Sequence, residues 1–174
     1  MKLAKEMKEI LDFINNRKDC VIFAGFAAYL QTGVRASKDI DVFVPSMDAV
    51  KKIAKYFSDK GWKQTGLKTD KKLFMASTLK KRNVTFDVIF SKSAKEILMP
   101  LRIKIQFNKY TLYSISPESL FLTKMSQLTS PKRTDNKTKR DRQVIARLRK
   151  KINLAKLRKL LQKMKDVFWT QGYF

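Results

Sequence analysis

The stretch Lys38-Asp-Ile-Asp-Val-Phe-Val44 decides how this chain is interpreted. It has the apolar alternation of a half-buried strand, yet it carries Asp39 and Asp41, and Asp is among the residues least favoured in strands. Side chains two residues apart in a strand point to the same face, so the two carboxylates should lie about 6.5 Å apart along it. The stretch therefore predicts a strand with one apolar face and one acidic face.

A second run, Val84-Thr-Phe-Asp-Val-Ile-Phe90, has the same character and carries Asp87 on the face opposite its apolar side chains. Carboxylates held close together repel one another unless a positive charge lies between them. Oxygen-only ligands of this kind suit Mg²⁺. A short acidic pair alone is a common surface feature, and the residues upstream of it favour a site.

The upstream segment reads as a short strand from Val21, a tight turn at Gly25, and a helix of small residues that ends at Gly33. A helix that begins directly after a strand presents free N–H groups at its first turn, which bind anions. Arg35 and Ser37 follow and offer a guanidinium and a hydroxyl to phosphate oxygens. The segment therefore predicts a phosphate site beside the acidic pair.

This order of residues resembles the nucleotidyltransferase superfamily that includes DNA polymerase beta. Among its members it resembles the minimal, stand-alone nucleotidyltransferases of prokaryotic toxin–antitoxin and phage-defence systems. The family pattern is a Gly-Gly or Gly-Ser turn, a helix, an Asp-x-Asp strand and a third acidic residue on another strand. The chain departs from it at Ala24, which stands where the family has its first glycine. The matching segments are Ala24-Gly25, Asp39-Ile-Asp41, Asp87, Ser116-Pro-Glu-Ser-Leu-Phe-Leu-Thr-Lys124 and Lys139-Arg-Asp141.

The resemblance implies an enzyme that moves a nucleotide from a nucleoside triphosphate, such as ATP or CTP, onto an acceptor hydroxyl. It implies that Asp39, Asp41 and Asp87 are the catalytic and metal-binding residues, holding two Mg²⁺ ions, with Asp87 also able to take the proton of the attacking hydroxyl. The nucleotide-binding residues that it implies are Gly25, Arg35, Ser37 and Lys124.

Composition excludes several other chemistries. The 174 residues contain no histidine and one cysteine, Cys20, so His-based catalysis and thiolate metal sites are absent. The five glycines form neither a Walker loop nor a dinucleotide fingerprint. No apolar run is long enough to span a bilayer and the amino terminus does not resemble a signal peptide, which predicts a cytoplasmic protein without membrane partners.

The net charge of +24 is unevenly distributed. Residues 131–165 contain fifteen basic and two acidic residues, a density that favours a polyanionic partner. We expect RNA, with the 3′ end of tRNA favoured by the resemblance, and a nucleic-acid-binding set of Lys139, Arg140, Arg142, Arg147 and Arg149. Two alternatives stay open: nucleotidylation of a partner protein in a toxin–antitoxin pair, and a non-catalytic nucleic-acid-binding module on the same fold.

The predicted fold class is α+β, with a mixed sheet flanked by helices. We expect a nucleotidyltransferase core over residues 1–128 and a basic helical segment over 129–174 that packs on it. The aromatic tail at 167–174 either docks on the protein, which we favour, or presents its rings to a partner. The expected helices are 3–16, 25–33, 46–60, 91–99, one that begins at Pro117 and two basic ones divided near Asn153; the expected strands are 20–24, 39–44, 73–79, 84–90, 101–107 and 110–115; and 129–137 is an expected loop.

Overall fold

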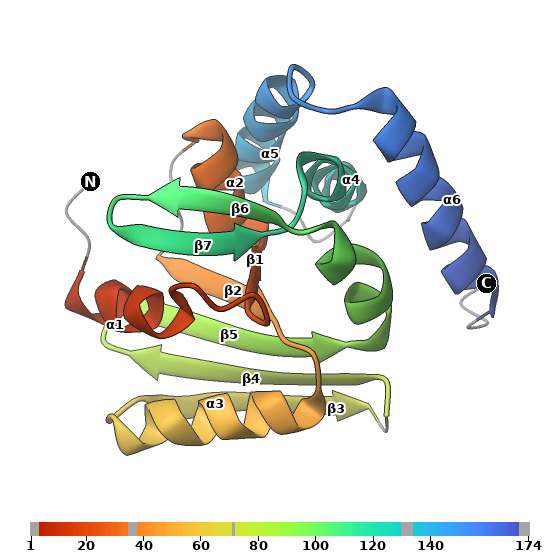
Figure 1. Ribbon diagram of the computed structural model, residues 1–174. Coiled ribbons are helices and arrows are strands. Elements are labelled where there is room, and N and C mark those ends of the chain that lie inside the picture. The colour runs from red at the N-terminus through yellow and green to blue at the C-terminus, as the bar shows by residue number, and fades with distance from the viewer. Residues whose placement is uncertain (1–3, 35–37, 71, 130–133, 171–174) are drawn as a thin grey trace.

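The structure is a computed structural model that describes residues 4–34, 38–70, 72–129 and 134–170, with side chains as far as Met164. Its central element is a seven-stranded mixed sheet in the order β3-β4-β5-β2-β1-β7-β6. Figure 1 shows this sheet as strongly twisted, with β3 at one edge and β6 at the other. The strands are β1 (Val21–Phe23), β2 (Asp39–Phe43), β3 (Lys63–Asp70), β4 (Phe74–Lys81), β5 (Val84–Ser91), β6 (Ile103–Phe107) and β7 (Tyr110–Ser114).

Two parallel pairings and four antiparallel ones build the sheet. Strand β2 lies parallel to β5, and β1 lies parallel to β7, while the other neighbours are antiparallel. Two-residue turns at Arg82–Asn83 and Asn108–Lys109 close the β4–β5 and β6–β7 hairpins. Arg82 and Asn108 both have positive φ, as the first residue of such a turn requires. The fold is therefore α+β with a mixed sheet, as predicted.

The first three helices, α1 (Lys5–Ile14), α2 (Ala24–Thr32) and α3 (Met47–Asp59), cover one face of the sheet. The register places Phe107, Leu112, Ile22, Val42 and Phe86 on this face. The ring of Phe26 in α2 lies 5.8 Å from that of Phe107, and the ring of Phe57 in α3 lies 4.9 Å from that of Phe86. The side chains of alternate residues along the strands point away from these three helices.

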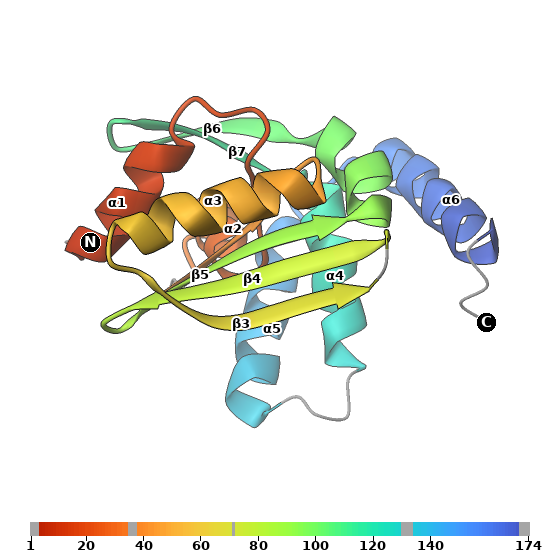
Figure 2. The ribbon, with the colours of Figure 1, turned by 90° about the horizontal axis from the view of Figure 1, so that it is seen from below.

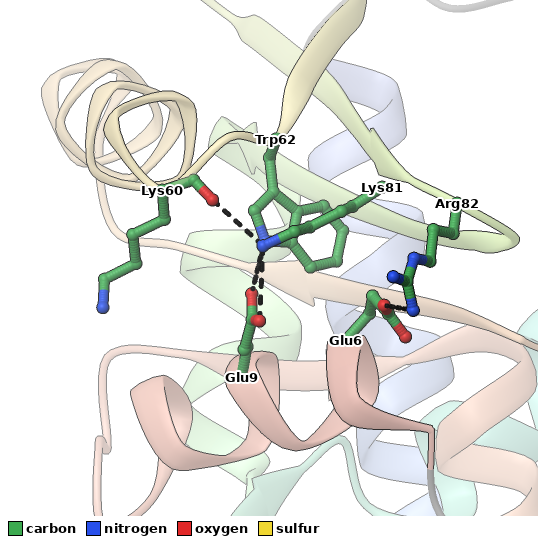
Figure 3. A network of polar contacts seen from close by, with 6 residues as sticks. All are labelled: Glu6, Glu9, Lys60, Trp62, Lys81 and Arg82. Carbon is green, nitrogen blue, oxygen red and sulfur yellow. Dashed lines mark hydrogen bonds and ion pairs between the residues drawn. The ribbon is translucent and has the colours of Figure 1, made fainter.

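The N-terminal helix is tied to the far half of the sheet by a polar network, drawn in Figure 3. The carboxylate of Glu9 accepts from the Trp62 indole at 3.0 Å and pairs with the Lys81 ammonium at 3.0 Å. That ammonium also donates to the carbonyl of Lys60 at 3.0 Å. One carboxylate thus joins α1 to strand β4 and to the end of α3.

The C-terminal helices form a second layer against α2. Figure 2 shows α4 (Pro117–Leu128) and α5 (Asp135–Leu148) running side by side, with α6 (Leu154–Thr170) beyond them. Val144 and Leu148 of α5 belong to the same hydrophobic cluster as the sheet. The division into 1–128 and 129–174 stays a prediction. None of the helices in the described ranges combines the length and apolar character of a membrane span.

Basic side chains of α5 and the turn after it cap the end of α2. The Arg147 guanidinium donates to the carbonyl of Thr32 at 2.6 Å, and the Lys151 ammonium donates to the carbonyl of Gln31. Cations at a helix C-terminus satisfy its last carbonyls and its dipole. Part of the positive charge therefore holds the two layers together.

Most of the predicted boundaries are confirmed to within a few residues. Gly33 ends α2 in the left-handed conformation, and Ser46 and Ser116 accept hydrogen bonds from the first turns of α3 and α4. Cys20 is buried, and burial raises the pKa of its thiol to about 12.

Three details of the prediction were wrong. Strand β3 was not predicted, because its polar side chains are almost all exposed at the sheet edge and show no apolar alternation. Residues 135–137 belong to α5 and not to a loop. The strand expected over 101–107 begins at Ile103, and Leu101 is 37% exposed at the end of a 3-10 turn, η2 (Met99–Leu101). The helix expected over 91–99, by contrast, is confirmed, since the chain is helical from Lys92 onward and includes a π-helical segment, η1 (Ala94–Leu98).

Candidate active site

The three carboxylates lie together on the sheet face that points away from α1, α2 and α3. Asp41 of β2 is directly opposite Asp87 of β5, and Asp39 is opposite Thr85. Ile40, between the two aspartates, is fully buried on the other face. Parallel pairing of β2 with β5 thus brings residues 46 positions apart into one acidic row.

Burial and mutual repulsion change the acidity of this row. Asp41 is half-buried, and Asp39 is exposed. Burial, followed by the charges of Asp87 and Asp39, raises the pKa of Asp41 to about 7, although the Lys124 ammonium opposes the shift. The site therefore holds more negative charge than its surroundings stabilise, which is the condition that a bound cation relieves.

The donor set is chemically suited to a hard divalent cation, since every candidate ligand is a carboxylate oxygen. In the described ranges, however, no three acidic, cysteine or histidine side chains converge closely enough to form a metal site. The carboxylates thus influence one another electrostatically but do not converge as the ligands of a single ion do. Metal binding by Asp39, Asp41 and Asp87 stays a prediction.

Lys124 lies next to this row in a buried ion pair. Its ammonium is 2.9 Å from the Asp141 carboxylate of α5 and donates to the amide oxygen of Gln127 at 3.0 Å. The side chains of Lys124 and Asp141 are 7% and 2% exposed. Breaking such a pair leaves a buried charge without compensation, which costs about 3–5 kcal/mol. The pair therefore holds α4 to α5 and keeps a cation near Asp41.

The start of α2 lies beside the acidic row, because Phe23 is paired with Asp41 and α2 begins at the next residue. No side chain in the described part of the chain caps this helix start. Ala24 has a φ of 55°, in the left-handed region that favours glycine. The turn therefore has an alanine in a conformation that suits glycine, and Gly25 follows in the first turn of the helix.

The remaining predicted residues are placed as follows. Arg35 and Ser37 lie outside the described residues. Lys139, Arg140, Arg142 and Arg149 are exposed on α5 or directly after it, whereas Arg147 is engaged with Thr32. Nucleic-acid binding by this set stays a prediction. Arg147 also has a structural role, because it contacts the end of α2.

Asp141 is a site residue that the sequence did not identify as one. The resemblance marked Lys139-Arg-Asp141 as a family segment, but nothing in the sequence shows that this carboxylate pairs with Lys124. The stacked rings of Phe23 and Phe43, 3.8 Å apart on the acidic face, were also not anticipated. Each depends on a pairing between strands or helices that are distant in sequence.

A mixed sheet with an acidic row beside a helix start defines a nucleotidyltransferase-like fold. The family described as "Nucleotidyltransferase of unknown function (DUF6036)" matches residues 1–172, and the chain belongs to this family. No curated protein matches the chain.

Two solved structures share the fold. An antigenic nucleotidyltransferase-like protein from Paracoccidioides brasiliensis is 13% identical, with a TM-score of 0.53 over 97% of this chain and 90% of its own. A nucleotidyltransferase candidate from Thermotoga maritima is 12% identical, with a TM-score of 0.53 over 71% of this chain and 83% of its own.

Proposed function

We propose that the protein is a Mg²⁺-dependent nucleotidyltransferase that moves a nucleotide from a nucleoside triphosphate to an acceptor hydroxyl, with RNA as the acceptor. The observation that supports it most is the pairing of Asp41 with Asp87 beside the start of α2. This pairing places carboxylates that suit a cation next to backbone N–H groups that suit phosphate oxygens.

In the proposed reaction the acceptor oxygen forms a bond to the α-phosphorus, and the bond from that phosphorus to the bridging oxygen of the β-phosphate breaks. Pyrophosphate leaves with the electron pair. Asp87 would accept the proton of the attacking hydroxyl, because it stands on the strand farther from α2. Two Mg²⁺ ions held by Asp39, Asp41 and Asp87 would supply charge neutralisation on the triphosphate and on the attacking oxygen.

The triphosphate would lie at the start of α2. Gly25, in its first turn, lets phosphate oxygens approach the backbone, and Ser37 and Arg35 would assist. Lys124 would contribute through its charge, which already acts on Asp41. Because Lys124 is paired with Asp141, its ammonium is held in place before any ligand binds.

The acceptor would approach from the other side of Asp87. Thr78 of β4 is opposite Asp87, and Gly66 of β3 is opposite Thr78, so small residues continue the row from the carboxylates to the sheet edge. The exposed basic residues of α5 supply the charge for a polynucleotide. Together they support RNA, and the tRNA 3′ end is the acceptor that the family resemblance favours.

The test is to incubate the protein with Mg²⁺, total RNA and each α-³²P-labelled triphosphate in turn. The variants are Asp87→Asn, which keeps the side-chain size, and Asp59→Asn, a matched change of an exposed carboxylate on α3. We expect labelled RNA from the wild type and Asp59→Asn, and about 10²- to 10³-fold less from Asp87→Asn, the scale on which preorganised electrostatic groups contribute.

The outcome also separates the alternatives. Label on a copurifying protein would assign protein nucleotidylation instead. If neither the wild type nor Asp87→Asn transfers label from any triphosphate, and both bind RNA tightly, the protein is a non-catalytic nucleic-acid-binding module. Thermal melts of all three proteins verify that the variants fold.

A further inference from the structure

A groove lies on the side of the molecule where α6 stands opposite the start of α4 and the η2–β6 connection (Figure 1). Its volume is about 450 Å³, within the range of sites that bind small ligands or side chains of a partner. The floor is aliphatic and is built by Leu101, Ile103, Pro117 and Leu160. We call it the lysine-rimmed groove, because lysines form its border.

The rim consists of Lys156, Lys159 and Lys163 of α6, with Lys151 in the turn before the helix. Lys151 is engaged with the carbonyl of Gln31. The three lysines of α6 are exposed and make no ion pair with any residue that the structure describes. Their spacing along one helix face spans about 10 Å. The rim is therefore a row of positive charges without acidic partners in the described ranges, next to the aliphatic floor of the groove.

The opposite wall is rigid. Ser116 caps α4, Pro117 occupies its first position, and the buried carboxylate of Glu118 accepts from the N–H of Asn153 at 2.9 Å. Asn153 in turn caps α6, accepting from the N–H of Lys156 at 3.1 Å. These contacts hold the start of α6 against the start of α4, so this end of the groove is formed by contacts within the chain.

The lining favours a peptide over a polynucleotide. Single-stranded nucleic acids are held by aromatic rings and guanidinium planes on which bases stack. None of the described residues that line the groove is aromatic or an arginine. An aliphatic floor instead accepts aliphatic or aromatic side chains, and lysines whose stems border it place their ammonium groups at the rim.

We propose that the lysine-rimmed groove is the docking site for an acidic amphipathic segment of a partner protein. Apolar side chains of the segment would fill the floor, and its carboxylates would pair with Lys156, Lys159 and Lys163. The site is separate from the carboxylate row, since Lys124 stands seven residues beyond Pro117, about 10 Å along α4. Docking therefore goes beyond the proposed catalysis and does not depend on it.

The probe is a displayed library of random 18-residue peptides, selected on the nuclease-treated full chain. The enriched peptide is then synthesised with a fluorophore, and a second version has its apolar residues replaced by serine at constant charge. Binding of both peptides, and of an RNA oligonucleotide, is measured by fluorescence anisotropy.

The groove variants of the protein are Leu101→Gln and the triple Lys156→Gln, Lys159→Gln, Lys163→Gln. The matched control is the triple Lys51→Gln, Lys52→Gln, Lys55→Gln on α3, which removes the same charge elsewhere.

We expect enriched peptides to combine Asp or Glu with leucine-like residues at helical spacing. The rim triple should lower peptide affinity at least about tenfold more than the α3 triple. Leu101→Gln should lower it about tenfold, as expected for removing one aliphatic contact, and the serine peptide, which lacks all of its apolar contacts, should bind at least about tenfold more weakly. RNA affinity should fall equally in the two triples. The proposal is overturned if no peptide is enriched, if the two triples affect the peptide equally, or if the rim triple selectively weakens RNA.

Discussion

Asp41 combines two properties that normally exclude one another: it stands in a strand of the core sheet, and it adjoins two further carboxylates. Its raised pKa has a consequence for stability. Between the ordinary pKa of an aspartate, about 4, and the folded value of about 7, the folded protein binds a proton that the unfolded chain does not. Stability must then decrease as the pH rises through this window.

We therefore expect the free energy of unfolding of the metal-free protein to fall between pH 4 and pH 7, with an upper limit of about 1.4 kcal/mol per pH unit from this residue. Asp41→Asn should remove most of that slope and stabilise the protein at pH 7. Urea unfolding in EDTA across the pH range measures it, and millimolar Mg²⁺ should flatten the wild-type curve if the row binds the cation. Parallel curves for wild type and variant would contradict the assignment.

Ala24 is the second residue with a specific consequence. A left-handed conformation costs a residue other than glycine about 1–2 kcal/mol, and a glycine at this position would avoid that cost. Part of the resulting stabilisation is offset because glycine has greater conformational freedom in the unfolded chain. Ala24→Gly should stabilise the protein by about 0.5–1 kcal/mol and, on the proposed function, lower the KM for the triphosphate, because a methyl group is removed from the turn. Urea unfolding and steady-state kinetics measure the two effects.

The control for this change is Ala146→Gly, on the exposed face of α5. There the helical conformation suits alanine, and the same substitution should destabilise by about 1 kcal/mol. Opposite signs at the two positions would attribute the effect to the positive φ of Ala24; equal losses would refute it.

At the scale of elements, α1 depends on Glu9 for its attachment to β4. Burial alone would raise the pKa of Glu9, but hydrogen bonds from Trp62 and Lys81 and the Lys81 charge outweigh it, so the pKa lies below its ordinary value. The resulting stabilisation is present at neutral pH and is lost as the pH falls through the folded pKa.

Glu9→Gln should then cost on the order of 1 kcal/mol at pH 7, a modest value because the pair is partly exposed, and the difference from wild type should shrink as the pH falls through the folded pKa, which lies below 4.5. The measurement is the unfolding free energy at pH 7 and pH 3.5. Asp48→Asn, at a highly exposed ion pair with Lys51 on α3, is the control that should change little. A loss of equal size at both pH values would indicate packing instead of charge.

The sequence carried enough information for the elements that form the active face. The alternation around Asp39 and Asp87 identified both strands, and the glycine at 33 and the serines at 46 and 116 marked helix ends. Strand β3 could not be found this way, because an edge strand with both faces exposed has no apolar pattern and depends on backbone pairing with β4. The Lys124–Asp141 pair and the docking of Arg147 also needed the structure, since a charge that joins two helices looks the same in sequence as one exposed to solvent.

At the scale of the whole molecule, the excess of positive charge divides into groups with different roles. Arg147 and Lys151 hold α5 to α2, the lysines of α6 border the groove, and the basic residues at the start of α5 are exposed beside the end of α4. A net charge of +24 attracts any polyanion over distances near the Debye length, so total charge alone does not identify a binding surface. The contribution of each location therefore has to be tested with variants that have the same total charge.

The final prediction compares two sets of four neutralised cations. The first set, Lys139, Arg140, Arg142 and Arg149, leaves out Arg147 because its loss would also detach α5 from α2. The second set, Lys8, Lys51, Lys52 and Lys55, lies on α1 and α3 and removes the same charge. If the first set contacts RNA, its neutralisation to Gln should lower the slope of log K against log salt by about 0.7 for each lost contact with a single strand and about 0.9 with a duplex.

The second set should change that slope by less than one contact, and neither set should change Mg²⁺-dependent triphosphate binding at the carboxylate row. Filter binding between 50 and 300 mM KCl and equilibrium dialysis with labelled triphosphate provide the two readouts. Equal slopes for the two variants would show that RNA responds to total charge and not to α5. A collapse of triphosphate binding in the first variant alone would mean that these residues serve the nucleotide, because α5 holds Asp141 against Lys124, and the polymer would then have to bind elsewhere.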